Sequence, residues 1–270
     1  MAPYSTGIEL ILNASEATLQ IGLTRDENPL CFQQWHLPAR ATEILAPALA
    51  HIFEALDIKA AGICRIACIN GPGSFTGIRL VLATAAALRR VNGAYVAALD
   101  YMQALATTLS MQTGLLYGRK IYVFVNARRN LVHFQPFMSF GPQIPAQPLE
   151  EVILAEPREA ISLVGPGKSF LCGSALRLYP QIFDPVRTGE GPAALPEACV
   201  FPELIDPSWN TLRLLARHGD YFRKDLTPKY IRTCDAVDNI NEIAPKQGMK
   251  GSEALEALNG ILNRAPHSAD

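Results

Sequence analysis

Apolar and polar positions in residues 1–100 predict an α/β unit. Short apolar or alternating runs have the length of strands, and two longer stretches place apolar side chains at helical spacing. Stretches rich in glycine, asparagine and proline separate them, as connections do. The predicted order is strands 8–12, 18–24 and 30–36, a helix 42–56, a strand 65–70, a helix 76–91 and a strand 95–99.

The two helices differ in their apolar pattern. Helix 42–56 carries its apolar side chains on one face, and Pro47 indicates that the helix proper begins close to that residue. Helix 76–91 is apolar on almost every side, which is typical of a helix buried all round. It predicts a central core helix, a helix with one face turned to a partner subunit, or both at once.

The second half of the chain predicts another α/β unit and then a polar tail. Residues 141–150 and 184–207 are rich in proline and glycine and should be loops. The expected elements are strands 120–126 and 131–140 in a hairpin, a strand 162–164, a helix from about 169 to 178, a helix capped by Ser208 that ends near 221, an extended segment 228–232, and a short amphipathic helix 252–262.

Composition narrows the class of protein. The 270 residues are 49% hydrophobic and 18% charged, with a formal net charge of −1, so the surface is not that of a stand-alone nucleic-acid binder. Arg89-Arg90 and Arg128-Arg129 are the obvious basic pairs. No apolar run is long enough to span a membrane, the first residues lack a secretory pattern, and six scattered cysteines indicate reduced thiols. We therefore expect a cytoplasmic protein without a zinc site.

The segment Asn70-Gly-Pro-Gly-Ser-Phe-Thr-Gly-Ile-Arg79 is the most distinctive in the chain. A strand, a glycine-rich turn and a helix in that order can present backbone N–H groups to an anion. Gly71 and Gly73 tolerate positive φ, and Ser74 or Thr76 can cap the helix. The same pattern also suits a tight, well-capped turn that binds nothing, and the residues leave both interpretations open.

Two other chemistries are disfavoured by their motifs. Residues 162–169, Ser-Leu-Val-Gly-Pro-Gly-Lys-Ser, end like a phosphate-binding P-loop. The first glycine of that motif is missing and Pro166 removes a backbone donor, so a nucleoside triphosphatase of this type is not expected. Ser74 lacks the flanking glycines of a serine nucleophile elbow.

The glycine segment resembles the signature of the bacterial TsaB (YeaZ) family. These proteins are non-catalytic relatives of TsaD/Kae1, which make N6-threonylcarbamoyladenosine in tRNA. Further segments are similar to the family in the same order, and the likeness covers roughly residues 7–236. They are Thr42-Glu-Ile-Leu45, Asn126-Ala-Arg-Arg-Asn-Leu-Val132, Val164-Gly-Pro-Gly167 and Pro228-Lys-Tyr-Ile-Arg232.

The resemblance implies a two-lobed α/β fold of the ASKHA class (actin-like ATPase, ribonuclease H-like). Its parts would be a first lobe 7–115, a second, degenerate lobe 116–236 and a mobile tail 237–270. It implies a scaffold that pairs with a TsaD-type paralogue, works with a TsaE-type ATPase, meets tRNA only through the complex, and can form a homodimer.

Two sets of site residues follow from the same resemblance. The partner face would lie on the two long helices, with Leu82 pointing outward, and comprises Ile44, Leu45, Leu49, Ile52, Ile78, Leu82 and Ala86. A vestigial, weak ATP or ADP contact, with no other cofactor, would use Gly71, Gly73, Ser74, Thr76, Gly165 and Gly167.

Departures from the family pattern argue against catalysis. Asn13-Ala14-Ser15 stands where the family has Asp-Thr-Ala, which removes the carboxylate that active ASKHA enzymes use near Mg²⁺. Asn126 and Asn130 replace an aspartate and a glycine. His36 and His51 lie too far apart for the paired metal ligands of catalytic paralogues. Two alternatives remain: an active ASKHA-type enzyme, either a kinase or an M22 glycoprotease-like peptidase, and a nucleotide-binding regulator.

Overall fold

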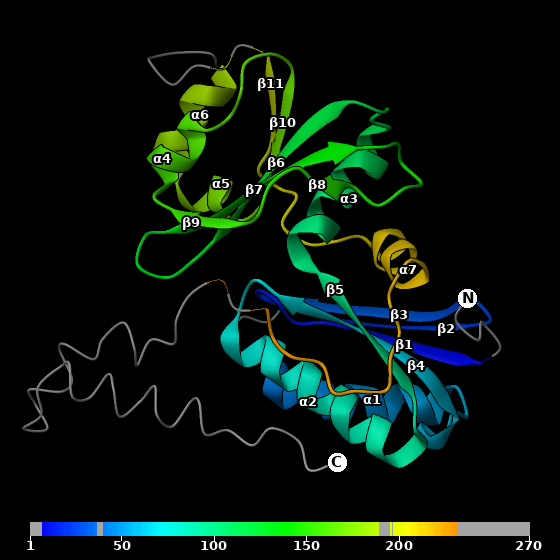
Figure 1. Cartoon of the computed structure of the whole chain (residues 1–270). Coiled ribbons are helices and arrows are strands. Elements are labelled where there is room, and N and C mark those ends of the chain that lie inside the picture. The colour runs from blue at the N-terminus through cyan, green and yellow to red at the C-terminus, as the bar shows by residue number, and fades with distance from the viewer. Residues whose placement is uncertain (1–6, 37–39, 189–194, 196, 230, 232–270) are drawn as a thin grey trace, which may run out of the picture. The chain divides into compact units, whose positions relative to one another are not determined.

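A computed structural model of the chain describes residues 7–36, 40–188, 195, 197–229 and 231 (Figure 1). The chain divides into a unit of residues 1–229 and a second unit of residues 230–270. Everything below concerns the first unit. The predicted tail 237–270, its helix 252–262 and the end of the segment 228–232 lie outside the described residues.

The first sheet confirms the predicted order of elements. Its strands are arranged β3-β2-β1-β4-β5, with β1, β2 and β3 antiparallel and β1, β4 and β5 parallel. The bounds are β1 Ile8–Asn13, β2 Thr18–Arg25, β3 Asn28–His36, α1 Ala41–Ala55, a 3-10 turn Ala60–Gly62, β4 Ile63–Gly71, α2 Phe75–Asn92 and β5 Tyr95–Asp100.

Successive side chains of β1 point alternately into two hydrophobic cores, one on each face of the sheet. Leu10 and Leu12 pack with α1 and α2, which lie side by side on one face of the sheet, whereas Ile11 between them faces the opposite core (Figure 1). That opposite core contains α3 (Tyr101–Thr113) and α7 (Trp209–Arg217). Each face of the first sheet is therefore covered, as expected for parallel strands.

Helices α1 and α2 depart from their predicted patterns in two respects. α1 begins at Ala41, well before Pro47, so proline sits inside the helix rather than near its start. α2 is buried along one face only, and its outer positions include exposed alanines, Ala83 and Ala87. Exposing an alanine side chain to solvent costs little free energy, and alanine favours the helix. The apolar sequence of α2 therefore did not require that every side of the helix be buried.

The second sheet has the order β11-β10-β6-β7-β8, and β9 also pairs with β7. The predicted hairpin is confirmed as β6 and β7. Helices α4, α5 and α6 cover the face of this sheet opposite α3 (Figure 1). The bounds are β6 Arg119–Asn126, β7 Val132–Ser139, β8 Gln147–Pro148, β9 Ile153–Ala155, α4 Pro157–Ser162, β10 Ser169–Cys172, α5 Ala175–Leu178, α6 Pro180–Thr188 and β11 Ala198–Phe201.

The elements predicted between residues 157 and 178 were wrong in type and in position. Residues 162–164 are not a strand, because Pro157 opens helix α4, which ends at Ser162. The predicted helix from 169 begins instead as strand β10, and only Ala175–Leu178 is helical. Short apolar runs fit either structure, and tertiary pairing decides between them. Helix α3 was not predicted at all. Strand β11 and the part of helix α6 after residue 183 fall within the stretch 184–207 that was expected to be loop.

Helix α7 confirms Ser208 as its cap and ends at Arg217 rather than near 221. The chain then returns to the first sheet, although it was assigned to the second lobe. Val96 and Phe222 form an antiparallel bridge, and the Lys229 amide donates to the carbonyl of Asn70 at 2.8 Å. Residues 219–229, the return segment, thus run beside α2.

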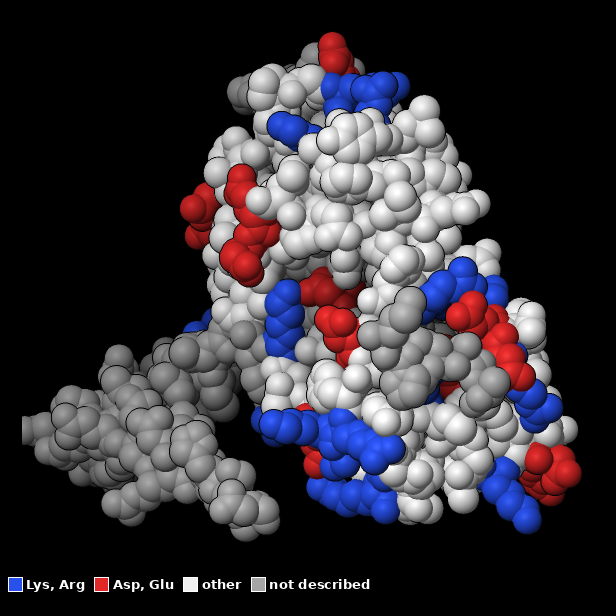
Figure 2. All heavy atoms as spheres, turned by 45° about the vertical axis from the view of Figure 1, so that its right-hand side comes forward, with Lys and Arg blue, Asp and Glu red and all other residues white. Residues whose placement is uncertain are grey.

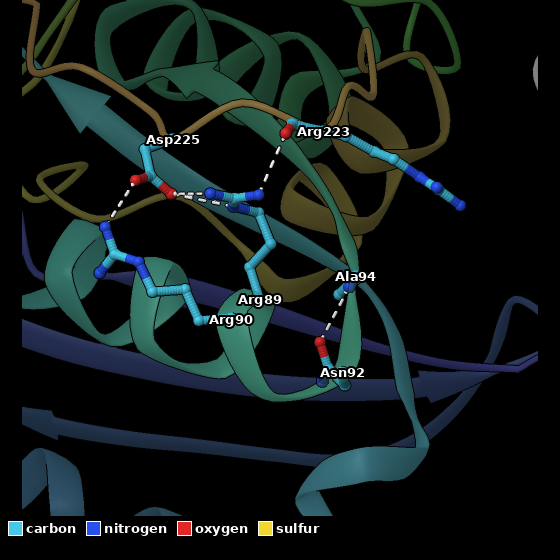
Figure 3. Close-up of polar contacts among 6 residues, drawn as sticks. All are labelled: Arg89, Arg90, Asn92, Ala94, Arg223 and Asp225. Atoms are coloured by element: carbon cyan, nitrogen blue, oxygen red, sulfur yellow. Dashed lines mark hydrogen bonds and ion pairs between the residues drawn. The ribbon is translucent and has the colours of Figure 1, made fainter. Parts of the chain in front are cut away.

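Side chains hold the return segment to the last turn of α2 (Figure 3). Arg89 donates to one carboxylate oxygen of Asp225 at 2.6 and 2.9 Å, and Arg90 donates to the other at 2.9 Å. Arg89 also donates to the carbonyl of Arg223 at 3.1 Å. The basic pair noted in the sequence therefore shares one carboxylate within the fold.

Candidate functional site

The carboxyl ends of β1, β4 and β5 lie at one edge of the first sheet. Because the three strands are parallel neighbours, the turns that follow them meet there. These are the turn Asn13–Ser15, the glycine loop Gly71–Ser74 and the junction of Asp100 with α3. This edge is where ligands of open α/β sheets bind, so it is the first candidate for a functional site.

The glycine loop packs against the chain's own backbone. A Cβ at position 73 would collide with the carbonyl of Ser15, and one at position 77 would collide with the carbonyl of Ala14. Gly71 has a φ of +127°, and a Cβ on this residue would lie only 2.8 Å from the carbonyl oxygen of Lys229. Close backbone approach thus accounts for each of these glycines without a ligand.

Ser74 is the residue that caps α2. Its Oγ accepts from the amide of Gly77 at 3.2 Å, and its own amide donates to the carbonyl of Ser15 at 2.5 Å. Thr76 is exposed and does not cap. Of the two interpretations left open by the sequence, the geometry matches the tight, capped turn. Nucleotide contact by Gly71, Gly73, Ser74 or Thr76 stays a prediction.

Asn13 builds the neighbouring turn. Its Oδ1 accepts from the amide of Ser15 at 2.9 Å, and its Nδ2 donates to Oε1 of Gln20 at 2.8 Å. The side chain is buried. An aspartate here would lose the donor to Gln20 and bury a charge, so the amide fits this position as a structural residue.

Glu16 connects this turn to the second sheet. One carboxyl oxygen accepts from Oγ of Ser174 at 2.6 Å, and the other lies 3.1 Å from the hydroxyl of Tyr101. Desolvation raises the pKa of Glu16 to about 7, and nearby Asp206 acts in the same direction, although the hydrogen bonds to Ser174 and Tyr101 oppose it. This carboxyl group was not singled out by any sequence motif.

The Tyr101 hydroxyl has two acceptors in this cluster. It lies 2.5 Å from the carbonyl oxygen of Ile205 and 3.1 Å from Oε2 of Glu16, so its single phenolic proton is directed mainly to the shorter contact. The raised pKa of Glu16 comes from burial.

Asp206 is a second desolvated carboxyl group in this cluster. It accepts from Oγ1 of Thr18 at 2.7 Å, and Thr18 also contacts Nδ1 of His36 at 3.1 Å. Burial raises the pKa of Asp206, while the hydrogen bond from Thr18 and the charge of His36 lower it. The cluster joins β2, β3 and the 205–206 segment through polar contacts alone.

The second glycine turn of the site is Gly173-Ser174, which sequence reasoning missed. Gly173 has φ +115°, and a Cβ there would collide with the carbonyl of Phe124. Ser174 accepts from the amide of Asn126 at 3.0 Å besides donating to Glu16. A glycine directly after a buried apolar run, Phe170 to Cys172, was the available signal, and the misplaced strand obscured it.

Gly165 and Gly167 do not join this site. They precede β10, whereas Gly173 and Ser174 follow it, so the two turns lie at opposite ends of the strand. The structure therefore does not bring Gly165 and Gly167 together with the turn Gly173-Ser174, and a nucleotide contact by them stays a prediction. Since a strand rather than a helix follows Lys168, the likeness to a P-loop also fails.

The structure also corrects the predicted partner face. Five of its seven residues are buried in the core beneath α1 and α2, including Leu82, which was expected to point outward. A side chain packed in the core cannot also contact another molecule without unfolding. The buried residues are Leu45, Leu49, Ile52, Ile78 and Leu82, while Ile44 and Ala86 are half-buried.

Small and apolar side chains instead form the outer side of the helix pair. On α2 the exposed positions Ala83, Ala87 and Val91 follow helical spacing, and on α1 Ala46 and Ala50 are exposed. Aromatic Phe75 at the start of α2 is 42% exposed, and the guanidinium carbon of Arg79 lies 3.8 Å from the centroid of its ring. We call the six residues Ala46, Ala50, Phe75, Ala83, Ala87 and Val91 the outer helix face.

Metal and membrane chemistry have no support in the described residues. In residues 7–36, 40–188 and 197–229 no three His, Cys, Asp or Glu side chains gather as metal ligands would. Within the same part of the chain, every helix is too short or too polar to cross a bilayer. Burial raises the pKa of the Cys68 and Cys172 thiols, so both are inert core residues.

Comparison with known proteins gives the chain its relatives. Residues 39–166 match the family of TsaD, tRNA N6-adenosine threonylcarbamoyltransferase. A Pseudomonas aeruginosa protein described as similar to peptidase YeaZ shares 17% identity, with a TM-score of 0.66, over 84% of this chain and 100% of its own. YeaZ from the same organism shares 17% identity, with a TM-score of 0.65, over 83% of this chain and 100% of its own. No curated protein matches.

Together these matches show a likeness to the TsaD family over residues 39–166 and the fold of the YeaZ structures. The family match covers α1, the glycine loop, α2 and the hairpin, which are the elements that carried the resemblance in the sequence. The match to the YeaZ structures extends to both sheets. The predicted fold class, a two-lobed α/β fold of the ASKHA type, is confirmed at this level.

Proposed function

We propose that this chain is a non-catalytic binding subunit in tRNA N6-threonylcarbamoyladenosine formation, where it pairs with a TsaD-type transferase. A TsaE-type ATPase would act on the same complex. A homodimer through the same face is the expected state when the transferase is absent. The tRNA modification role follows from the likeness to TsaD over residues 39–166 and to YeaZ.

The outer helix face is the observation that carries this proposal. Two neighbouring helices that present alanines allow another helix pair to approach closely, and Phe75 and Val91 supply larger apolar contacts at the edges. Charged side chains, among them Arg79 and Arg90, surround the alanines as the rim of an interface does.

The proposal that the chain is not an enzyme rests on the residues at the carboxyl ends of β1, β4 and β5. Asn13 makes the turn and has no carboxylate that could bind a metal ion. The space beside Gly73 and Gly77 is occupied by the chain's own carbonyl groups. Glu16 is held by Ser174 rather than directed at an open site. Turnover of ATP with Mg²⁺ by the purified chain would contradict this part of the proposal.

Calorimetric titration with the TsaD-type protein of the same genome tests the pairing. Ala83→Arg places a charge on the outer helix face without touching the core, and we expect it to weaken the complex at least tenfold because the charge would be desolvated. Thermal unfolding of the variant should match that of the unchanged chain. Leu178→Arg, at a 56% exposed position of α5, is the matched control and should bind normally.

Leu82→Arg separates the two interpretations of α2. At this buried position we expect loss of the fold, seen as lost cooperative unfolding, rather than selective loss of binding. A Leu82→Arg variant that folds but fails to bind would support the partner face predicted from the sequence, with Leu82 in the interface. A complex unaffected by Ala83→Arg would refute the outer helix face as the interface.

A further inference from the structure

One edge of the second sheet gathers basic side chains. Arg119 and Lys120 begin β6, and Lys168 directly precedes β10. Lys120 pairs in register with Ser169, so Arg119 and Lys168 occupy the preceding positions of the two neighbouring strands. All three side chains are exposed, and Figure 2 shows basic side chains gathered at the top of the face it displays.

These cations are not neutralised by the described part of the chain. No ion pair joins any of them to a carboxylate in residues 7–36, 40–188 or 197–229, in contrast to Arg89 and Arg90. Glu197, which precedes β11 at the register position beside Lys168, is exposed and forms no ion pair with these described cations. Lys168 Nζ lies 5.9 Å from the centroid of the Phe170 ring, but the like charges of Arg119 and Lys168 on adjacent strands repel each other.

Exposed aromatic and apolar side chains lie at the same edge. Tyr117 is 73% exposed and contacts Phe140, 37% exposed, edge to face with ring centroids 5.1 Å apart. Leu116 beside Tyr117 is 71% exposed. The amide of Gly118 donates to the carbonyl of Ser139 at 3.1 Å, which fixes the loop of Tyr117 to the end of β7 next to Arg119.

We propose that this basic-aromatic edge, formed by Tyr117, Arg119, Lys120, Phe140 and Lys168, binds an unpaired segment of RNA. Cations that lack partners contact phosphates, and exposed rings offer a surface on which bases stack. An acidic polypeptide such as polyglutamate would satisfy the charges but offers no ring for Tyr117 to stack on. The inference rests on the proposed function, because RNA is the substrate class of that reaction.

The edge would supplement RNA binding by the transferase rather than replace it. With a net charge of −1, the chain binds RNA weakly on its own, and three phosphate contacts confer a modest salt dependence. Binding of a fluorescein-labelled, unstructured RNA oligonucleotide to the full chain is therefore measured by anisotropy at low salt, and then repeated with tRNA and the chain in complex with its transferase.

The variant Arg119→Gln, Lys120→Gln, Lys168→Gln should lower the affinity for the oligonucleotide about tenfold and reduce the salt slope by roughly 2. The matched control Arg25→Gln, Lys59→Gln, Lys224→Gln removes the same charge from exposed positions elsewhere and should change affinity little. Tyr117→Ala should weaken binding about tenfold at unchanged salt slope. Glu197→Gln should strengthen it.

Equal loss in the two triple variants would overturn the proposal, because net charge and not this edge would then be responsible. Equally tight binding of polyglutamate would overturn it as well. If the edge variants leave RNA binding unchanged while the transferase complex still forms, the inference fails and the proposed function stands. If RNA binds at the edge but no transferase complex forms, the inference stands and the proposed function fails.

Discussion

The carbonyl oxygen of Ala14 occupies the place that a side chain on Gly77 would need. The first turn of α2 is thereby seated directly on the turn that follows β1. A methyl group at position 77 would have to push apart two backbone segments, neither of which is a flexible side-chain end. The distinctive glycines of this chain thus serve the contact between two turns, and their substitution should be read first as a folding defect.

Gly77→Ala should destabilise the protein by about 2–3 kcal/mol, the cost of overpacking a tight site. Urea unfolding followed by circular dichroism measures the effect as a lower midpoint. Gly62→Ala is the control, because a Cβ at position 62 meets no atom within 4 Å. Equal midpoints for the two variants would show that the turns separate freely, contrary to the packing described.

Stability should fall as pH rises through the neutral range because of Glu16. Burial raises its pKa from the ordinary value of 4.5 to about 7, so the folded protein binds this proton more tightly than the unfolded chain does. The penalty for ionising Glu16 is absent below about pH 4.5, develops between there and pH 7, and is complete above it. It amounts to at most about 3 kcal/mol.

Glu16→Gln keeps the size of the side chain but cannot ionise. We expect the free energy of unfolding of this variant to depend less on pH between 4.5 and 7, and to exceed that of the unchanged chain at pH 8. Urea titrations at a series of pH values make the comparison. Glu43→Gln, at an exposed position of α1, is the control and should keep the original pH dependence. A pH profile of Glu16→Gln identical to that of the parent would contradict the raised pKa of the buried Glu16.

Asp225→Asn should loosen the return segment rather than unfold the protein. It removes the negative charge and one of the two oxygens that accept from Arg89 and Arg90. Because Arg90 and Asp225 are exposed and Arg89 is half-buried, the global cost should be about 1 kcal/mol or less. Hydrogen exchange of the amides in residues 219–229 should accelerate locally. Asp220→Asn, an exposed residue of the same segment, should leave exchange unchanged.

Asn130→Gly should stabilise the β6–β7 hairpin by about 0.5–1 kcal/mol. Arg129 and Asn130 have φ of +62° and +58°, so both central residues of this turn are left-handed, as in a type I′ turn. Glycine takes this conformation without strain. Thermal unfolding measures the gain, and a lower midpoint would show that the Asn130 side chain contributes more than its backbone strain costs.

The sequence determined the first sheet and its helices well. Five strands with clear apolar runs and Ser74 as an N-cap are local signals, and the order of elements followed from them. The glycine segment carried the family resemblance, and in the structure its glycines lie where two backbone segments touch.

Tertiary structure decided what local pattern could not. Whether residues 162–172 became helix or strand depended on pairing with β6 and β11, which lies outside any short window. Leu82 and Ala83 are adjacent apolar residues of one helix, and only packing against the sheet made the first core and the second surface. The Glu16 cluster joins residues as far apart as 16, 101 and 174, so its desolvation exists only in the folded chain.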